Sequence, residues 1–283
     1  MLEAEHITKF IENGFVHVAG AFSRATAERC IEIMWPGTGC APHDRTTWTK
    51  PLVRLPEYID EPFRTAIQMP SLEEAFDQLV GPGRWRRRFG IGPIPVRFPH
   101  TESPGDDYWH FEGSYLPEGW KGHSFTNYRS RGCALLMLFL FTDVAESDAP
   151  TRLRIGSHLA LPGRLRRYGD EGIDATRIDE TGVLEATADL PVAYATGSAG
   201  DVYLCHPFLI HAAQPHHGDT PRFMATPTLE PAAPLELERA DGTYSPVEEA
   251  IRVGLGRQES DRPRRESAAF RRASRRGARV GPA

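Results

Sequence analysis

The chain has 283 residues, of which 40% are hydrophobic and 25% charged, with a formal net charge of −5. This composition is ordinary for a soluble globular protein with a sizeable core, and no hydrophobic run approaches the roughly 18 residues that span a bilayer. Four cysteines without a CxxC pair argue against a thiolate zinc site or a disulfide framework. The acidic start is unlike a signal peptide, so we expect a cytoplasmic protein with no membrane partner.

Hydrophobic side chains recur at helical spacing in three segments of the first third of the chain, residues 3–13, 23–34 and 71–80. Gly14 supplies a stop for the first segment, Ser23 is a suitable N-cap for the second, and Gly81 closes the third. Residues 15–18 alternate as a short strand, whereas residues 38–70 show no sustained period and are expected to form loops and short pieces. These elements are predicted to be scaffold.

The sequence pattern changes after residue 85. From there to residue 229, short segments rich in aromatic and β-branched residues are separated by Gly and Pro. The longest apolar run, from Ala134 to Phe141, fits a buried strand. Residues 162–196 form a long polar interruption, which is often a lid or a pocket wall. This order predicts a mainly β fold with N-terminal helices, in which a jelly roll removes exposed strand edges.

We expect one domain over residues 1–256, with a jelly-roll core at about 85–230. From Arg257 to the end the chain has nine arginines and three acidic residues among Ser, Ala and Gly. Such a tail could touch nucleic acid or acidic lipid, but a solvated, poorly ordered terminus is the better interpretation. No nucleic-acid partner is therefore expected, and the sequence carries no indication of oligomeric state.

Three residues are candidates for a metal site. His110 and Glu112 are two apart, so on a strand their side chains leave the same face and could take adjacent positions on one metal. Such a pair alone also arises by chance on surface strands. His211 stands in the apolar run 208–213, where an imidazole needs a partner, either a metal or a backbone carbonyl. Two histidines and one carboxylate are the ligand set of non-haem Fe(II) oxygenases.

Arg222 follows His211 by 11 residues, across a turn-rich loop that can return the chain beside itself. Its guanidinium could then point into the same cavity. Because arginine grips a carboxylate with two parallel hydrogen bonds and keeps its charge, it suits the distal carboxylate of 2-oxoglutarate. An ordinary surface ion pair is the alternative.

These residues resemble the phytanoyl-CoA dioxygenase family of Fe(II)/2-oxoglutarate-dependent oxygenases. The similarity covers about residues 5–230 and is most specific from Gly200 to Arg222. It implies a double-stranded β-helix of the jelly-roll, cupin-like type, with iron held by His110, Glu112 and His211, and with 2-oxoglutarate held by Arg222. By this match the metal ligand is His211 and not His206.

The chain departs from the usual family pattern at two positions. The family usually has Asp where this chain has Glu112, which lengthens the reach but keeps a carboxylate. A hydroxyl residue often stands where this chain has Ala213, so one common hydrogen bond to 2-oxoglutarate is in question. Among the other histidines, His206 is the leading rival ligand if the match is wrong, while His216 and His217 are expected to be solvated.

We therefore predict an Fe(II)/2-oxoglutarate-dependent dioxygenase that uses O2 to hydroxylate a small organic substrate, with succinate and CO2 as co-products. One alternative is a non-oxidative metal-dependent jelly-roll enzyme. Another is a non-catalytic binding module with a vestigial site. Arginines at 129, 131, 152 and 154 could bind an acidic substrate, although ion pairs with the acidic body explain them equally well.

Overall fold

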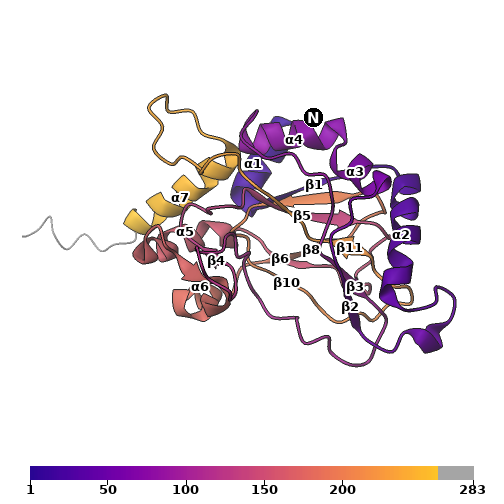
Figure 1. The fold of residues 1–283 in the computed structure, drawn as a ribbon. Coiled ribbons are helices and arrows are strands. Elements are labelled where there is room, and N and C mark those ends of the chain that lie inside the picture. The colour runs from indigo at the N-terminus through magenta and orange to yellow at the C-terminus, as the bar shows by residue number, and fades with distance from the viewer. Residues whose placement is uncertain (261–283) are drawn as a thin grey trace, which may run out of the picture.

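The structure is a computed structural model that describes residues 1–260 of the chain. Helices come first along the chain and again at the end of the described part, with short ones between (Figure 1). The α-helices are α1 Ala4–Asn13, α2 Arg24–Thr38, α3 Glu61–Ile67, α4 Pro70–Val80, α5 Leu161–Leu165, α6 Val183–Ala186 and α7 Pro246–Ser260. The 3-10 helices are Arg45–Thr47, Ser157–Leu159, Arg166–Tyr168 and Ala175–Thr181.

The strands form two main sheets and two small pairs. The strands are β1 Phe15–Val18, β2 Leu52–Leu55, β3 Ile94–Arg97, β4 Phe125–Thr126, β5 Leu135–Leu140, β6 Arg152–Arg154, β7 Ile173–Asp174, β8 Val192–Tyr194, β9 Val202–Cys205, β10 His211–Ala212, β11 Met224–Ala225 and β12 Thr228–Leu229. The major sheet has the order β1-β9-β5-β11, with β12 also paired to β5, and the minor sheet has the order β10-β6-β8. All these pairings are antiparallel.

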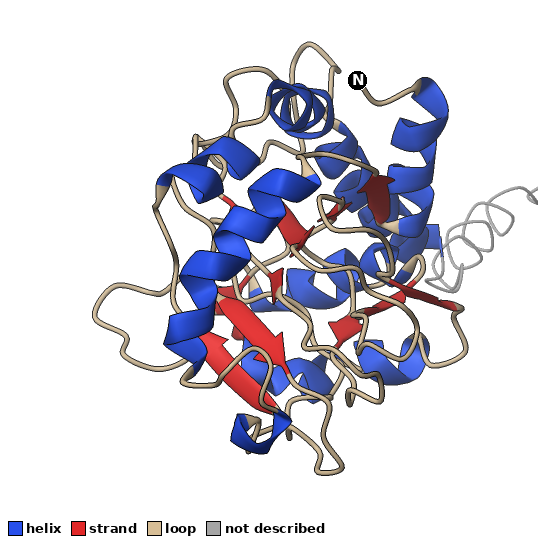
Figure 2. Cartoon of the chain, turned by 90° about the vertical axis from the view of Figure 1, so that its right-hand side faces the viewer, coloured by secondary structure: helices blue, strands red, loops and turns tan. Residues whose placement is uncertain are grey.

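Strand β5 is buried on both faces, which explains its unbroken run of apolar residues. Leu135, Met137 and Phe139 belong to the larger hydrophobic cluster, which includes residues of the helices. Leu136 and Leu138 belong to the smaller cluster, together with side chains of the minor sheet. The major sheet therefore lies between a layer of helices and the minor sheet, an arrangement visible in Figures 1 and 2.

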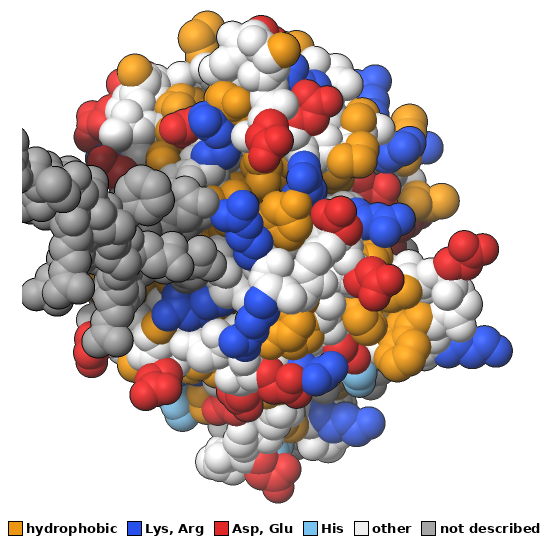
Figure 3. Space-filling view, turned by 90° about the vertical axis from the view of Figure 1, so that its left-hand side faces the viewer, with side chains coloured by type: hydrophobic (Ala, Val, Ile, Leu, Met, Phe, Trp, Pro, Cys, Tyr) orange, Lys and Arg blue, Asp and Glu red, His pale blue; other side chains and the backbone are white. Residues whose placement is uncertain are grey.

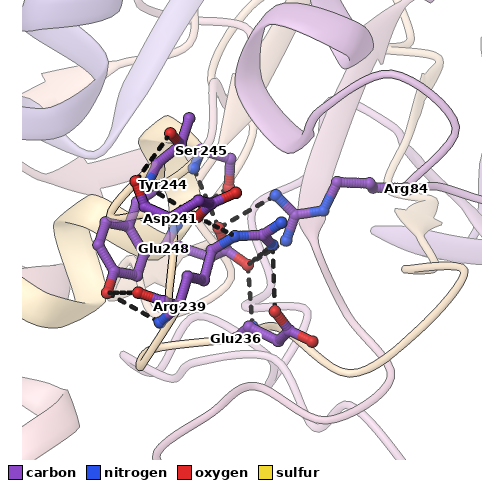
Figure 4. Close-up of polar contacts among 8 residues, drawn as sticks. Arg84, Glu236, Arg239, Asp241, Tyr244, Ser245 and Glu248 are labelled. Carbon is purple, nitrogen blue, oxygen red and sulfur yellow. Dashed lines mark hydrogen bonds and ion pairs between the residues drawn. The ribbon is translucent and has the colours of Figure 1, made fainter.

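Helix α7 is anchored by a buried charge that we call the Glu248 cluster: Arg84, Glu236, Arg239, Ser245 and Glu248 (Figure 4). Ser245 and Glu248 form reciprocal side-chain to backbone hydrogen bonds of 3.3 and 3.0 Å, which is a capping box. The Glu248 carboxylate also accepts from Arg84 and, at 2.8 Å, from the backbone N–H of Glu236. The Glu248 side chain is fully buried, and both of its carboxylate oxygens accept hydrogen bonds.

Most of the predicted elements are present in the structure, and several further elements were not predicted. The helices expected at 3–13, 23–34 and 71–80 correspond to α1, α2 and α4, although α2 continues through Pro36. Residues 38–70, expected to form loops and short pieces, contain the short elements β2 and α3, and the interruption at 162–196 contains most of α5 together with α6, β7 and β8. The expected domain boundary at 256 falls within α7, and the rest of the predicted tail, residues 261–283, lies outside the described residues.

The four cysteines are unpaired thiols, as expected. Among the described residues, no helix combines the length and the apolar character needed to cross a membrane. Figure 3 shows the face of the molecule that carries α7, where acidic, basic and hydrophobic side chains are interspersed around the part that the grey atoms cover. The visible part of this face has no continuous basic stripe of the kind that binds nucleic acid.

Candidate metal and co-substrate site

A cavity of about 200 Å³ contains the candidate residues, and two isolated strand pairings build its walls. The first joins His110 to His211 at the edge of the minor sheet, with backbone hydrogen bonds of 2.9 Å in both directions. The second joins Arg97 to Arg222 beside the major sheet, with bonds of 3.0 and 2.8 Å. The segment around His110 was expected to be a strand, but a single bridge is all the pairing that it makes in the described chain.

The three predicted metal ligands meet in this cavity. One ligand atom from each of His110, Glu112 and His211 lies within 4.8 Å of the others. The two imidazole rings have centroids 4.3 Å apart, and His211 Nε2 lies 3.3 Å from Glu112 Oε1. Nitrogen and carboxylate donors at this separation match the ligand set of a divalent transition metal.

The protonation of both imidazoles leaves the correct nitrogen available for a metal. His110 Nδ1 lies 3.0 Å from the carbonyl oxygen of Tyr108, and His211 Nδ1 lies 2.9 Å from that of Leu209. Since a carbonyl oxygen only accepts, each Nδ1 must carry the proton, and Nε2 of a neutral ring keeps its lone pair. The lone pairs of His211 Nε2 and Glu112 then face each other, an arrangement that requires a bound cation or a shared proton.

Charge effects in the cavity favour the protonation states that bind a metal. Burial, together with the proximity of His211, lowers the pKa of His110 to about 4, so this ring is neutral at pH 7. Burial opposes ionisation of Glu112, but the proton that its carboxylate can share with His211 and the proximity of His110 outweigh burial, so the pKa of Glu112 lies below its ordinary value. The carboxylate is therefore ionised at pH 7.

Arg222 lines the same cavity and is 2% exposed. It donates to the carbonyl oxygens of Ala149 and Pro95, the latter at 3.3 Å, while its Nε has no acceptor among the described residues. Burial and then the charge of Arg97 hold the pKa of Arg222 well below its ordinary value. A buried cation without a counter-ion is costly, so this guanidinium is suited to receive an anionic ligand.

Three further charged residues line the cavity and were missed by the sequence analysis: Arg54, Arg97 and Asp106. Arg97 Nη2 donates to both oxygens of Asp106 at 2.8 Å, and Arg54 donates to the same carboxylate at 2.6 Å. No local pattern indicates these residues, because Arg97 reaches the site only through the pairing of distant strands. The register of β2 and β3 pairs Leu52 with Arg97 and Arg54 with Pro95, and this register places both arginines on one face of the strand pair.

Two other histidines, His206 and His216, have structural roles. His206 is fully buried; its Nδ1 accepts from the N–H of Phe208 at 3.1 Å, and its Nε2 donates to the carbonyl of Val247 at 3.3 Å. The structure thus does not bring the rival His206 into the metal group. The expectation for His216 was wrong: it is 4% exposed, because its ring closes the loop through a 2.8 Å hydrogen bond to the carbonyl of Thr220.

Among the other candidate arginines, Arg129 forms an ion pair with Asp170 at 3.5 Å, whereas Arg152 and Arg154 contact an aromatic ring. The guanidinium groups of Arg152 and Arg154 lie 4.9 and 4.3 Å from the ring centroid of Trp109. Arg152 also donates to the carbonyls of Asp107 and Ala213 at 2.7 and 2.8 Å. These contacts hold the segment before His110 against the minor sheet, so the arginines position a ligand-bearing segment.

Ala213 lines the cavity without a hydroxyl, as the sequence showed. Two hydroxyl residues line the same cavity, Thr151 immediately before β6 and Thr226 immediately after β11. The Thr151 hydroxyl lies 3.4 Å from the sulfur of Met224, a weak acceptor that leaves it available to a ligand. The cavity therefore keeps hydroxyl groups although position 213 has none.

Comparisons with known proteins identify the family of the chain and its fold. The profile of the phytanoyl-CoA dioxygenase (PhyH) family matches residues 10–224, which is more than half of the chain. No curated protein sequence matches the chain.

Solved structures with a similar fold include HygX from Streptomyces hygroscopicus with nickel and 2-oxoglutarate bound (16% identity, 82% of this chain and 88% of that chain covered, TM-score 0.53). The epimerase SnoN, in complex with Fe3+, alpha ketoglutarate and nogalamycin RO, is also similar (18% identity, 84% and 86% covered, TM-score 0.53). The non-heme alpha ketoglutarate dependent carbocyclase SnoK from nogalamycin biosynthesis is a third (17%, 81% and 84%, TM-score 0.50). At such identities the likeness concerns the fold, and it confirms the predicted jelly roll.

Proposed function

The chain belongs to the phytanoyl-CoA dioxygenase family of Fe(II)/2-oxoglutarate-dependent enzymes, and from this premise we propose that His110, Glu112 and His211 bind the iron and that Arg222 binds 2-oxoglutarate. The observation that carries the assignment is the convergence of three ligand atoms within 4.8 Å, with both imidazoles presenting Nε2. The metal-bound and 2-oxoglutarate-bound structures of HygX and SnoN support it by analogy of fold.

The reaction we propose is hydroxylation of a small organic molecule. When bound, iron and 2-oxoglutarate supply the oxidation by O2, with succinate and CO2 as co-products. The protein's own contribution is placement. The carbonyls of Tyr108 and Leu209 fix both imidazole rings, and the two sheets enclose the cavity and limit the access of water.

The domain organisation and the location of the protein are also part of the proposal. Residues 1–256 form one oxygenase domain, because α7 packs against α1 and α5 and connects the end of the described chain to its beginning. The larger hydrophobic cluster, which joins side chains of the helices and of the major sheet, supports this assignment. We place the enzyme in the cytoplasm on its composition, because its four cysteines contain no CxxC pair and fit a reducing compartment.

The test is anaerobic addition of Fe(II) and then 2-oxoglutarate to the purified protein. The wild type is expected to bind one iron and to develop the weak visible charge-transfer band of chelated 2-oxoglutarate. Substitutions His211→Ala and Glu112→Ala are expected to abolish both signals. His206→Gln is the matched control, because this histidine is buried outside the metal group and should leave both signals intact.

The alternative functions give different results in the same experiment. A non-oxidative metalloenzyme would bind the metal without the 2-oxoglutarate band and without release of succinate in a substrate screen. A vestigial binding module would remain folded without stoichiometric iron. Iron binding that survives His211→Ala and is lost in His206→Gln would contradict the assigned ligands.

A further inference from the structure

Two buried arginines face each other across the wall of the cavity. Arg97 and Arg222 are partners in an antiparallel bridge, and both line the cavity. Each is only 2% exposed. Like charges directly opposite each other on neighbouring strands destabilise a sheet, and burial increases the cost. A second buried arginine at this point therefore calls for a ligand that compensates its charge.

The hydrogen-bond donors of the pair are only partly used. Arg97 donates through Nη2 to Asp106, while its Nε and Nη1 have no acceptor in the described part of the chain. Arg222 uses Nη1 and Nη2 on carbonyl groups, and its Nε likewise lacks an acceptor. Three buried N–H nitrogens at one cavity are thus unsatisfied, whereas buried donors are normally hydrogen-bonded.

The carboxylate already present does not balance the pair. Asp106 is shared between Arg97 and Arg54, whose Nη2 atoms lie 2.8 and 2.6 Å from the same oxygen, Oδ2. Asp106 therefore fixes the guanidinium of Arg97 in one orientation without reaching Arg222 through a hydrogen bond.

The depth of Arg97 in the cavity also matters. Arg97 is buried, whereas Arg54 and Tyr108 are 61% and 65% exposed and mark the mouth of the cavity. The unsatisfied donors are buried, away from this exposed mouth.

From this geometry we infer that Arg97 is a second positioning residue for 2-oxoglutarate, which holds the distal carboxylate jointly with Arg222 and is itself oriented by Asp106. The inference rests on the proposed function. A carboxylate has about four lone-pair sites, so it can accept from both guanidinium groups at once. The arginine pair, Arg97 and Arg222, then selects a 2-oxo acid with a second carboxylate over one without it.

The experiment is calorimetric titration of the Ni(II)-loaded protein, which does not turn over, with 2-oxoglutarate and with 2-oxobutanoate, which lacks the distal carboxylate. Arg97→Gln is expected to weaken 2-oxoglutarate binding about tenfold or more and to leave 2-oxobutanoate binding unchanged. Arg97→Lys keeps the positive charge but loses the planar guanidinium that donates two parallel hydrogen bonds, so it should weaken binding by a smaller factor. This variant replaces Arg97→Gln if the latter does not fold. Arg24→Gln, which removes an exposed arginine outside the cavity, is the control and should bind 2-oxoglutarate as the wild type does.

Two results would overturn the inference while leaving the proposed function intact. One is unchanged 2-oxoglutarate affinity in both Arg97 variants when Arg222→Gln loses binding. The other is an equal loss for both ligands, which would mean that Arg97 only maintains the cavity. If the wild type binds nickel but no 2-oxoglutarate, the proposed function fails first, and this inference fails with it.

Discussion

The protein buries charge in two places and treats it in opposite ways. In the Glu248 cluster, the carboxylate of Glu248 accepts from Arg84 and from the backbone of Glu236 and Ser245, so that its oxygens are supplied. In the arginine pair, three buried nitrogens have no acceptor in the described chain. A buried charge whose hydrogen bonds are all made stabilises the fold, whereas a buried charge with unused donors is available to bind a ligand.

The largest expected effect concerns the arginine pair. Arg222→Met should weaken 2-oxoglutarate binding by about a hundredfold, because two charge-assisted hydrogen bonds are lost. The stability of the ligand-free protein should change by less than about 1 kcal/mol, since the loss of an uncompensated buried charge offsets the loss of two hydrogen bonds to carbonyls. Calorimetric titration measures the loss of binding, and urea unfolding measures the change in stability. A large loss of stability would contradict the claim that the arginine pair, unlike the Glu248 cluster, serves binding and not the fold.

The Glu248 cluster should respond in the opposite sense. Glu248→Gln leaves Arg84 without its charged partner and weakens the capping box of α7, so we expect a loss of about 3–5 kcal/mol in the free energy of unfolding. Iron and 2-oxoglutarate binding should be unchanged in the folded fraction. Urea unfolding with Glu249→Gln as the matched control, a partly exposed neighbour on the same helix, tests this prediction. Equal effects of the two substitutions would count against it.

The contribution of Glu248 should depend on pH. Burial opposes its ionisation, but hydrogen bonds from Arg84 and the backbone outweigh burial and lower its pKa below the ordinary value of 4.5. A depressed pKa in the folded state stabilises the protein fully above the unfolded-state pKa and loses that stabilisation as the pH falls through the folded-state value. The stability difference between wild type and Glu248→Gln should therefore be constant from pH 6 to 8 and shrink below about pH 4.5. A difference that grows on acidification would refute this reading.

The smallest effect is expected where charges are exposed. Arg24 and Asp143 form an ion pair of 2.6 Å with both side chains more than half exposed. Arg24→Gln should change the free energy of unfolding by less than about 1 kcal/mol, because solvent screens such pairs. Thermal unfolding in low and high salt measures it, and a loss approaching that of Glu248→Gln would show that burial does not distinguish the two kinds of pair.

The comparison also explains what the sequence could and could not predict. His110, Glu112 and His211 could be proposed as metal ligands from the sequence, because their residue types and short-range context indicate metal chemistry. Arg97 was not, because an arginine on a strand has many roles and only its pairing with Arg222, 125 residues later, gives it this one.

Helix α7 was also not predicted, although part of the signal for it is present in the sequence. The capping box of Ser245 and Glu248, with Pro246 at the first helical position, was readable in the sequence as a helix start. Its charged partner Arg84 was not readable, because it lies 164 residues away along the chain. Local signals thus located the elements, while the contacts that give charged residues their roles depended on the tertiary fold.

Strand β5 connects the outer layer of the protein to its chemistry. Leu138 lines the cavity, whereas its neighbours Met137 and Phe139 pack on the opposite face among the helices. Because closely packed interiors transmit changes of volume, enlarging a side chain on the helical face shifts the strand and the cavity wall together. Variation far from any ligand can thus retune which molecules the enzyme accepts, giving evolution and protein engineering a route to new selectivity that spares the metal ligands.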